Sequence, residues 1–303
     1  MTDNRGIAAA VASFVMWGLL PIYWKLMASV PAHEILCHRM AWSLLVTVAL
    51  LAGSGKLNGF ISVFRQRGKF LYFLLTAAIL SVNWLVYIWA VNNGYIVEAS
   101  LGYFINPLVS VCFGVLFLKE RLSPPQWLSV FLAFVAVCYL TFLYGSFPWI
   151  ALLLAATFAS YGLLRKITTV PPLEGLCLET TILFLPALLV LLVLEVRGDS
   201  AFLHAPASIT VLLAGSGVVT SVPLLLFCYA AQKIPLYLVG ILQYLAPTIS
   251  LFVGVYVYHE PFSPERMVGF AIIWLALAIF IASSLTRQLK ALHSLRRFGG
   301  PGK

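Results

Sequence analysis

The chain has 303 residues, of which 62% are hydrophobic and only 10% are charged. Soluble domains carry about 25% charged residues, so a water-soluble core is excluded and the chain is predicted to be an integral membrane protein. The formal net charge of +9 does not indicate a nucleic-acid partner, because the Lys and Arg residues lie between apolar runs and do not form one patch.

A helix needs about 20 apolar residues to cross a bilayer, and ten apolar runs of roughly this length follow one another along the chain. They cover residues 6–27, 33–52, 70–91, 98–118, 125–143, 147–164, 174–194, 209–231, 236–257 and 265–285. The first run is too long for the apolar part of a secretory signal, so it is interpreted as a retained span. The sequence therefore predicts an all-α integral membrane protein with ten transmembrane helices.

The positive charges predict how the spans are oriented. With both termini in the cytoplasm, 15 of the 19 Lys and Arg residues lie on the cytoplasmic side. The opposite side holds Arg197 and Arg266, while Lys25 lies near a span end and Arg39 lies within the second span. Positive residues concentrate on the cytoplasmic side of membrane proteins, so both termini are predicted to be cytoplasmic.

The chain contains an internal repeat. Residues 100–124 read SLGYFINPLVSVCFGVLFLKERLSP and residues 240–264 read GILQYLAPTISLFVGVYVYHEPFSP, with matches 140 positions apart such as Pro107 and Pro247. Each unit holds five predicted spans, and because five is odd the second unit must enter the membrane inverted. The expected organisation is a first five-helix repeat over 1–145, an inverted second repeat over 146–286 and a basic cytoplasmic tail over 287–303.

Three strings carry a family resemblance: EILCHRMAWS at 34–43, NWLVYIWAVNNGYIVEASLGYFINPL at 83–108 and ERLSPPQW at 120–127. Together with the paired five-span units, they make the chain resemble the RarD family of EamA-domain transporters, in the drug/metabolite transporter superfamily. The resemblance implies ten spans, the cytoplasmic (inner) membrane of a bacterium and the export of small molecules. RarD proteins are named for chloramphenicol sensitivity or resistance, which says little about their physiological substrate. Inverted repeats in secondary transporters hold substrate near the midplane and rock to alternate access.

The second span opens with the densest group of polar residues inside any predicted span. Glu34, His38 and Trp42 are four positions apart and share one helical face, with Arg39 one step beside it. Arg39 is a candidate clamp for a carboxylate or phosphate of the substrate, and Glu34 or His38 is a candidate to take up a coupling proton. The alternative is an internal Glu34–Arg39 ion pair near the outer surface.

Polar side chains also follow single faces of the third, fourth and ninth spans. They are Asn83 and Tyr87 in the third span, Tyr103, Asn106 and Ser110 in the fourth, and Gln243 and Ser250 in the ninth. Tyr244, next to Gln243, is a further candidate for binding substrate. Buried amides and phenols need hydrogen-bond partners in lipid, so these residues either line a midplane cavity or join helices. The recurrence of the stripe in the fourth and ninth spans favours a shared substrate cavity. Pro107 and Pro247 are predicted hinges, because proline removes a backbone hydrogen bond, with packing kinks as the alternative.

Residues near the span ends receive structural interpretations. Lys25 and Arg165, which share the 140-residue offset, are expected to snorkel toward the membrane surface. Glu120 is expected to act as a cap or ion-pair partner. Trp17 and Trp24 are assigned to the interfacial aromatic belt.

The leading functional prediction is a secondary transporter that exports small metabolites or drugs, with amino-acid-like or chloramphenicol-like molecules as candidate substrates. No GxxxxGK[ST] motif is present, so the energy is expected to come from an ion gradient, exchange or the substrate's own gradient. Arg39 and its aromatic neighbours favour a substrate with an anionic group and an apolar or aromatic body. The predicted partners are this substrate, membrane lipid and a coupling proton; the oligomeric state is open.

Three alternatives accompany this prediction. The first is an importer, since topology does not fix the direction of flux. The second is a non-transporting sensor or assembly subunit. The third is a membrane-embedded enzyme, which would need a nucleophile–base pair or a metal cluster; HExxH is absent and the five cysteines lack metal-site spacing, so no enzyme, metal or cofactor is predicted.

Overall fold

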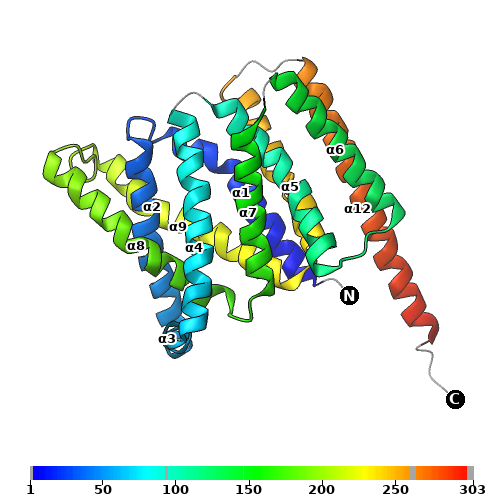
Figure 1. Cartoon of the computed structure of the whole chain (residues 1–303), viewed down its shortest axis with the longest axis horizontal. Coiled ribbons are helices and arrows are strands. Elements are labelled where there is room, and N and C mark those ends of the chain that lie inside the picture. The colour runs from blue at the N-terminus through cyan, green and yellow to red at the C-terminus, as the bar shows by residue number, and fades with distance from the viewer. Residues whose placement is uncertain (1–2, 93–94, 146, 260–263, 299–303) are drawn as a thin grey trace.

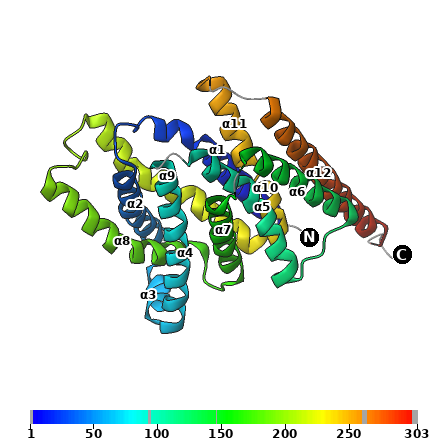
Figure 2. The ribbon, with the colours of Figure 1, turned by 45° about the horizontal axis from the view of Figure 1, so that its top comes forward.

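The computed structural model describes residues 3–92, 95–145, 147–259 and 264–298, and every regular element within them is helical (Figures 1 and 2). The elements are α1 (Asn4–Lys25), α2 (Ala32–Gly53), α3 (Leu57–Arg65), α4 (Arg67–Asn92), α5 (Ile96–Leu118), α6 (Pro124–Tyr144), α7 (Trp149–Ile167), α8 (Pro172–Arg197), α9 (Ala207–Lys233), α10 (Leu236–Leu242), α11 (Leu245–Phe252), the π-helical turn η1 (Val253–Val257) and α12 (Pro264–Phe298).

Nine stretches among the described residues are long and apolar enough to cross a membrane, with α10 to η1 counted as one. The last helix, α12, adds a shorter apolar stretch, Met267–Ser283, and continues helically past the predicted end of the second repeat. The all-α membrane fold is thus confirmed, while the count of ten spans stays a prediction. The nine-residue α3 was not predicted, because it is too short to span and buries only Val63.

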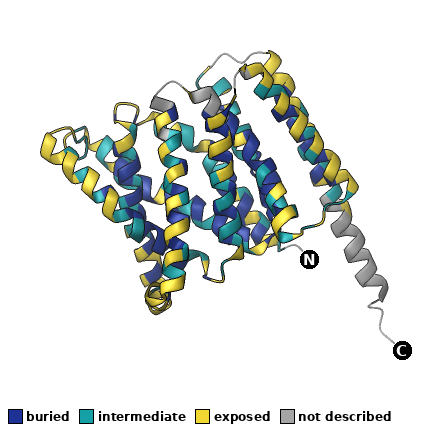
Figure 3. Cartoon of the chain, in the orientation of Figure 1, coloured by how far each residue is buried: buried dark blue, intermediate teal, exposed yellow. Residues whose placement is uncertain are grey.

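The outer surface of the helical layer is apolar. Large hydrophobic side chains on the outward faces of the peripheral helices are exposed, including Leu116, Phe131, Phe142 and Leu185 (Figure 3). In water such a surface would be costly, whereas lipid tails are as apolar as these side chains. The exposed apolar faces are therefore the surface that contacts membrane lipid.

The helix packing follows the 140-residue repeat. The offset pairs α1 with α7, α2 with α8, α4 with α9, α5 with the stretch from α10 to η1, and α6 with α12. Three of these pairs pack directly against each other: α2 with α8, α5 with α10 and α6 with α12. Other contacts occur as matched sets, since α1 packs on α9 as α7 packs on α4. Each repeat thus meets the other through equivalent faces.

The two repeats run in opposite directions. In Figure 1, α1 starts at the lower edge of the helical layer and α7 starts at the upper edge. The start of α1 and the end of α12 lie at the same lower edge, which we call the terminal side. The other edge is called the far side. The assignment of the terminal side to the cytoplasm stays a prediction.

Two glycines allow helices of different repeats to touch backbone to backbone. A Cβ on Gly217 of α9 would lie 2.5 Å from the carbonyl carbon of Trp42 on α2. A Cβ on Gly240 of α10 would lie 2.8 Å from the carbonyl oxygen of Pro107 on α5. Only a residue without a Cβ fits at these two crossings, so they hold the repeats at close range.

The ninth apolar stretch is broken where α10 ends and α11 begins, at Gln243 and Tyr244. Pro247 has no N–H to donate to the Gln243 carbonyl one turn earlier, and that oxygen accepts from the Ala246 N–H at 3.2 Å instead. By contrast, α5 continues through Pro107. The predicted hinge role of both prolines stays a prediction, and a helix interruption is observed only beside Pro247.

Candidate functional site

A cavity of about 390 Å³ lies between helices of both repeats. Small-molecule pockets span about 300–1,000 Å³, so this one suits a small metabolite. The cavity-lining residues of α1 come from its second half, and those of α5 and α7 come from their first halves. Because of the directions in which these helices run, the cavity lies toward the far side of the molecule (Figure 1).

Polar faces predicted on four separate spans meet at this cavity. The predicted residues that line it are Arg39, Asn83, Tyr87, Tyr103, Asn106, Gln243, Pro247 and Ser250. Some of their polar groups are already used by the protein: the Asn83 amide donates to the Leu154 carbonyl at 2.9 Å, and Ser250 Oγ donates to the Gly18 carbonyl at 3.0 Å. Their role in binding substrate stays a prediction.

Arg39 brings a positive charge to the cavity wall. Its Nε donates to Thr220 Oγ1 on α9 at 3.0 Å. The guanidinium carbon lies 4.7 Å from the ring centroid of Trp24 and 5.1 Å from that of Trp84. Among the described residues Arg39 forms no ion pair, so the alternative of a Glu34–Arg39 pair is wrong. An arginine held by two indoles and a hydroxyl presents its remaining N–H groups to an incoming anion.

The rest of the polar cluster on α2 faces away from the cavity. Glu34 Oε1 accepts from the backbone N–H of Ala201 at 2.7 Å and of Phe202 at 3.3 Å. The rings of His38 and Trp42 lie 4.8 Å and 6.0 Å from the Phe202 ring. The three residues share one face because they are four positions apart, and that face packs against the segment between α8 and α9. Among the described residues that line the cavity, none of the three occurs.

Ser110 and Tyr244 lie in the contact between α5 and the broken ninth stretch. The Tyr244 hydroxyl donates to the Phe104 carbonyl at 3.2 Å, and Ser110 Oγ donates to Asn106 Oδ1 at 3.4 Å. Neither residue lines the described cavity. The Tyr244 bond joins two segments of different repeats, as the alternative predicts, whereas the Ser110 bond stays within α5.

The sequence analysis did not predict the aromatic wall of the cavity. Trp17, Trp24 and Phe158 line the cavity, and the Trp17 and Phe158 rings meet edge to face at 5.6 Å. The sequence predicted Trp17 and Trp24 only as members of the interfacial belt and did not predict their place at the cavity wall. They are seven positions apart, about two helical turns, so they occupy one face of α1, and that spacing was the available signal.

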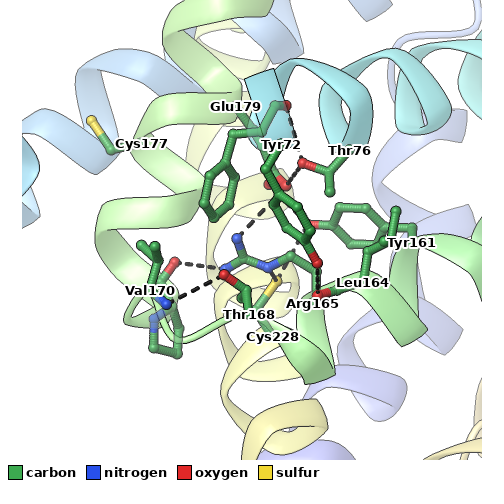
Figure 4. A network of polar contacts seen from close by, with 12 residues as sticks. Tyr72, Thr76, Tyr161, Leu164, Arg165, Thr168, Val170, Cys177, Glu179 and Cys228 are labelled. Carbon is green, nitrogen blue, oxygen red and sulfur yellow. Dashed lines mark hydrogen bonds and ion pairs between the residues drawn. The ribbon is translucent and has the colours of Figure 1, made fainter. Parts of the chain in front are cut away.

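A buried polar network links helices toward the terminal side of the molecule (Figure 4). We call Thr76, Tyr161, Arg165, Glu179 and Cys228 the terminal-side network. Arg165 Nη1 lies 3.7 Å from Glu179 Oε1, and both side chains are withdrawn from solvent, at 0% and 1% exposure. Thr76 Oγ1 donates to Glu179 at 2.6 Å and the Tyr161 hydroxyl donates at 2.9 Å, while Arg165 Nε donates to Cys228 Sγ at 3.1 Å. The network joins α4, α7, α8 and α9.

The prediction that Arg165 snorkels to the membrane surface is wrong. A Cβ on Gly175 would lie 2.3 Å from Arg165 Nη1, so the glycine leaves the space that the guanidinium fills. Glu179 then supplies the counter-charge that a buried cation requires. Glu120, in contrast, acts as the expected cap: its carboxylate accepts from the backbone N–H groups of Leu236 and Tyr237 at the start of α10, at 2.7 and 2.9 Å.

The repeats differ at the two charged positions of this network. The 140-residue offset relates Arg165 to Lys25 and Glu179 to Arg39. The first repeat therefore carries two cations where the second carries an ion pair. Lys25 Nζ lies 3.8 Å from the ring centroid of Tyr258. The paired charges lie on the terminal side and the unpaired Arg39 lies at the cavity.

Comparison with known proteins matches both halves of the chain to one family. The model of the EamA-like transporter family matches residues 4–142 and 147–282. A solved crystal structure described only as that of a protein superposes with a TM-score of 0.70 at 18% identity, covering 92% of this chain and 98% of that one. At this identity the likeness shows the fold alone.

Curated relatives align over almost their whole length. Protein RarD of Streptomyces exfoliatus is 45% identical, with 93% of this chain and 90% of the relative aligned. A protein of Bacillus subtilis described as an uncharacterized transporter is 44% identical, with 93% and 95% aligned. The chloramphenicol-sensitive protein RarD of Pseudomonas aeruginosa is 31% identical, with 91% and 93% aligned. The chain belongs to the EamA-like transporter family, as a RarD-type membrane transporter of the bacterial inner membrane.

Proposed function

We propose that this transporter exports small organic molecules by alternating access through the cavity between its two repeats. The observation that carries the proposal is the position of that cavity: it lies toward the far side, while the buried terminal-side network links helices toward the other side. A transporter at rest in one state of an alternating cycle has this arrangement. With the termini in the cytoplasm, the state is outward-facing.

The packing of the repeats supports exchange between two such states. The packing of α1 against α9 has its counterpart in the packing of α7 against α4, with the membrane direction reversed. An exchange of conformations between the repeats would therefore close the far side with contacts like those now closing the terminal side. This movement keeps the fold unchanged: each repeat adopts the conformation that the other had before.

The cavity favours a substrate with a carboxylate or similar anionic group and a flat apolar body. Arg39 is the charged residue among the described lining residues, and the indoles of Trp17, Trp24 and Trp84 offer flat faces. Guanidinium groups bind planar anions through paired hydrogen bonds. An amino-acid-like molecule meets these requirements, because its ammonium group can face the tyrosine and tryptophan rings.

The test compares the culture media of matched bacterial strains by untargeted mass spectrometry. One strain expresses the natural chain, one expresses Arg39→Ala, and one expresses Arg197→Ala, which removes an exposed cation at the end of α8 away from the cavity. The three proteins are brought to equal membrane levels. We expect a metabolite to accumulate outside with the natural chain and with Arg197→Ala, and to be lost with Arg39→Ala.

Two results would overturn the proposal. Identical media from all strains would remove the basis for export. Depletion of a metabolite from the medium by the natural chain would reverse the direction and make the protein an importer. Export that is equal in Arg39→Ala would leave transport in place and remove the anion-binding role of Arg39.

A further inference from the structure

We propose that Glu179 binds the coupling proton, and that this proton opens the terminal side by releasing Arg165. The inference rests on the proposed function, because a coupling proton has meaning only in a transport cycle. The geometry that carries it is the placement of Glu179 on the terminal side of the cavity, in a buried ion pair with Arg165.

A small void lies beside Glu179 and shares part of its wall with the cavity. Its volume is about 10 Å³, and a cavity needs about 10–15 Å³ of such volume to hold one water molecule. Trp84, Thr220 and Leu224 line both this void and the cavity, and the Glu179 side chain lines the void from the other side. The void and the cavity therefore share part of their walls, and the void is about large enough for one water molecule.

The exposed wall of the void is almost entirely apolar, but four of the residues around it carry hydroxyl groups: Ser43, Thr180, Thr220 and Ser221. Ser221 is 1% exposed, and its Oγ has no hydrogen-bond partner among the described residues. A buried hydroxyl without a partner is costly, and a water molecule in the void would satisfy it. In the proposed cycle the Ser221 hydroxyl, which can both donate and accept, holds the water molecule that passes a proton toward Glu179.

The groups around Glu179 leave Arg165 as its counter-charge. Helix α7 contributes Arg165 and the Tyr161 hydroxyl, and α4 contributes Thr76 together with the nearby Tyr72 phenol, which donates to the Leu164 carbonyl. Helix α9 contributes the Cys228 thiol, which contacts Arg165 and Tyr161. From α2, Met40 and Ser43 reach the void, and neither titrates. The charge of Glu179 therefore decides whether the Arg165 guanidinium is neutralised.

Binding of a proton changes this balance. An O–H bond forms on the Glu179 carboxyl as one breaks on the hydronium ion that delivers the proton, which leaves a water molecule, and the side chain becomes neutral. Arg165 then lies at 0% exposure without a counter-charge, an arrangement that strongly destabilises a closed interface. Entry of water from the terminal side relieves it. The proton leaves to that side, the ion pair re-forms, and each cycle moves one proton inward against one substrate outward.

The same geometry favours Glu179 over Glu34 and His38, the candidates that the sequence suggested. Glu34 and His38 lie at the segment between α8 and α9, outside the described lining of the cavity and the void. The first-repeat counterpart of Glu179 is Arg39, so the repeat supplies no second acid at this level. One carboxyl group then serves the whole cycle.

Cys228 provides a reporter that needs no substrate. It is fully buried in the terminal-side network, close to the end of α7. A variant retaining Cys228 alone is made by replacing the other cysteines with alanine: Cys37, Cys112, Cys138 and Cys177. Its reaction with a membrane-impermeant maleimide applied from the terminal side is followed in oriented vesicles from acidic to mildly alkaline pH. Each rate is divided by the rate for the denatured protein at the same pH, which removes the intrinsic pH dependence of the thiol.

We expect acidification to raise the normalised labelling rate about tenfold, as a minor open state becomes the major one. Glu179→Gln imitates the protonated acid and should be labelled fast at every pH. Glu174→Gln is the matched control, since Glu174 is a buried glutamate on the same helix outside the network. It should keep the pH dependence of the parent.

Slow, pH-independent labelling of the parent would overturn the proposal, as would protection of Glu179→Gln equal to that of the parent. If Glu179→Gln does not fold, Glu179→Asp keeps a carboxylate and must keep the pH dependence; its loss in a folded protein also overturns the proposal. A second reporter, Ala246→Cys in the cavity without Cys228, should become protected as Cys228 becomes exposed. Reciprocal changes without pH dependence would refute the proton site alone, whereas absence of any reciprocal change would refute alternating access.

Discussion

Replacing Gly217 with alanine is expected to push α9 away from α2. The added Cβ would lie 2.5 Å from the Trp42 carbonyl carbon and 2.7 Å from its oxygen, whereas ordinary contact begins at 3.4 Å. The helices must therefore separate by about 0.9 Å (3.4 − 2.5) at this crossing. The atoms in contact are backbone atoms of a helix, so no side chain can rotate out of the way.

The magnitude follows from this separation. Overpacking costs about 1–3 kcal/mol, and the rigid contact places Gly217→Ala in the upper half of that range. Thr220 lies one turn after Gly217, and a shift of about 0.9 Å would stretch its 3.0 Å contact with Arg39 Nε to about 3.9 Å, beyond hydrogen-bonding distance. The substitution should therefore lower stability and also release Arg39 at the cavity wall.

The assay is thermal unfolding of the purified protein in detergent, followed by tryptophan fluorescence. Gly68→Ala is the control, because nothing lies within 4 Å of a Cβ at that helical position. Alanine is favoured over glycine in helices by about 0.5–1 kcal/mol, so this control should be neutral or slightly stabilising. A melting temperature for Gly217→Ala equal to that of Gly68→Ala would refute the close-crossing argument.

Three further substitutions test other contacts. Glu120→Ala should lower the free energy of unfolding by about 1–3 kcal/mol, since hydrogen bonds to a charged group are lost at the start of α10; an unchanged melting temperature would contradict this. Glu34→Ala should increase hydrogen exchange in segment 200–206 without changing substrate export. Loss of export would instead support a role for Glu34 in substrate transport. Arg165→Met alone should destabilise by about 3–5 kcal/mol, whereas Arg165→Met with Glu179→Met should recover most of that loss while abolishing pH-dependent opening. A double variant as unstable as the single one would contradict the buried-pair argument.

The fold was predictable because the strongest signals in this sequence are its apolar runs and its repeat. Run lengths specify membrane helices, and the odd number of predicted spans in each unit leads to the inversion that Figure 1 shows. The polar stripes containing Asn83, Tyr87 and Asn106 led to the cavity, because polar atoms on a helix in lipid must face protein or water. The short α3 carried no such signal.

The two charge clusters were harder to interpret. The contacts of a charged side chain depend on where it lies around its helix and on which residues of other helices lie beside it. Glu34 and Arg39 are five positions apart, which places them about 140° apart around the helix. A pair between them was therefore sterically poor, and Glu34 found backbone donors in a distant segment instead. Arg165 resembled a snorkelling residue, since its acidic partner Glu179 and the space beside Gly175 lie on another helix.

The unequal charges of the two repeats have an energetic consequence. If an inverted repeat had chemically identical halves, a two-fold rotation would relate its inward- and outward-facing states. The two states would then have equal energy and equal populations at zero gradient. Each departure from identity tips that balance, by a factor of ten for about every 1.4 kcal/mol. The Arg165–Glu179 pair, set against Lys25 and Arg39, is such a departure. Substitutions at these positions during evolution would thus change which of the two states the substrate-free protein prefers, even without any contact between these residues and the substrate.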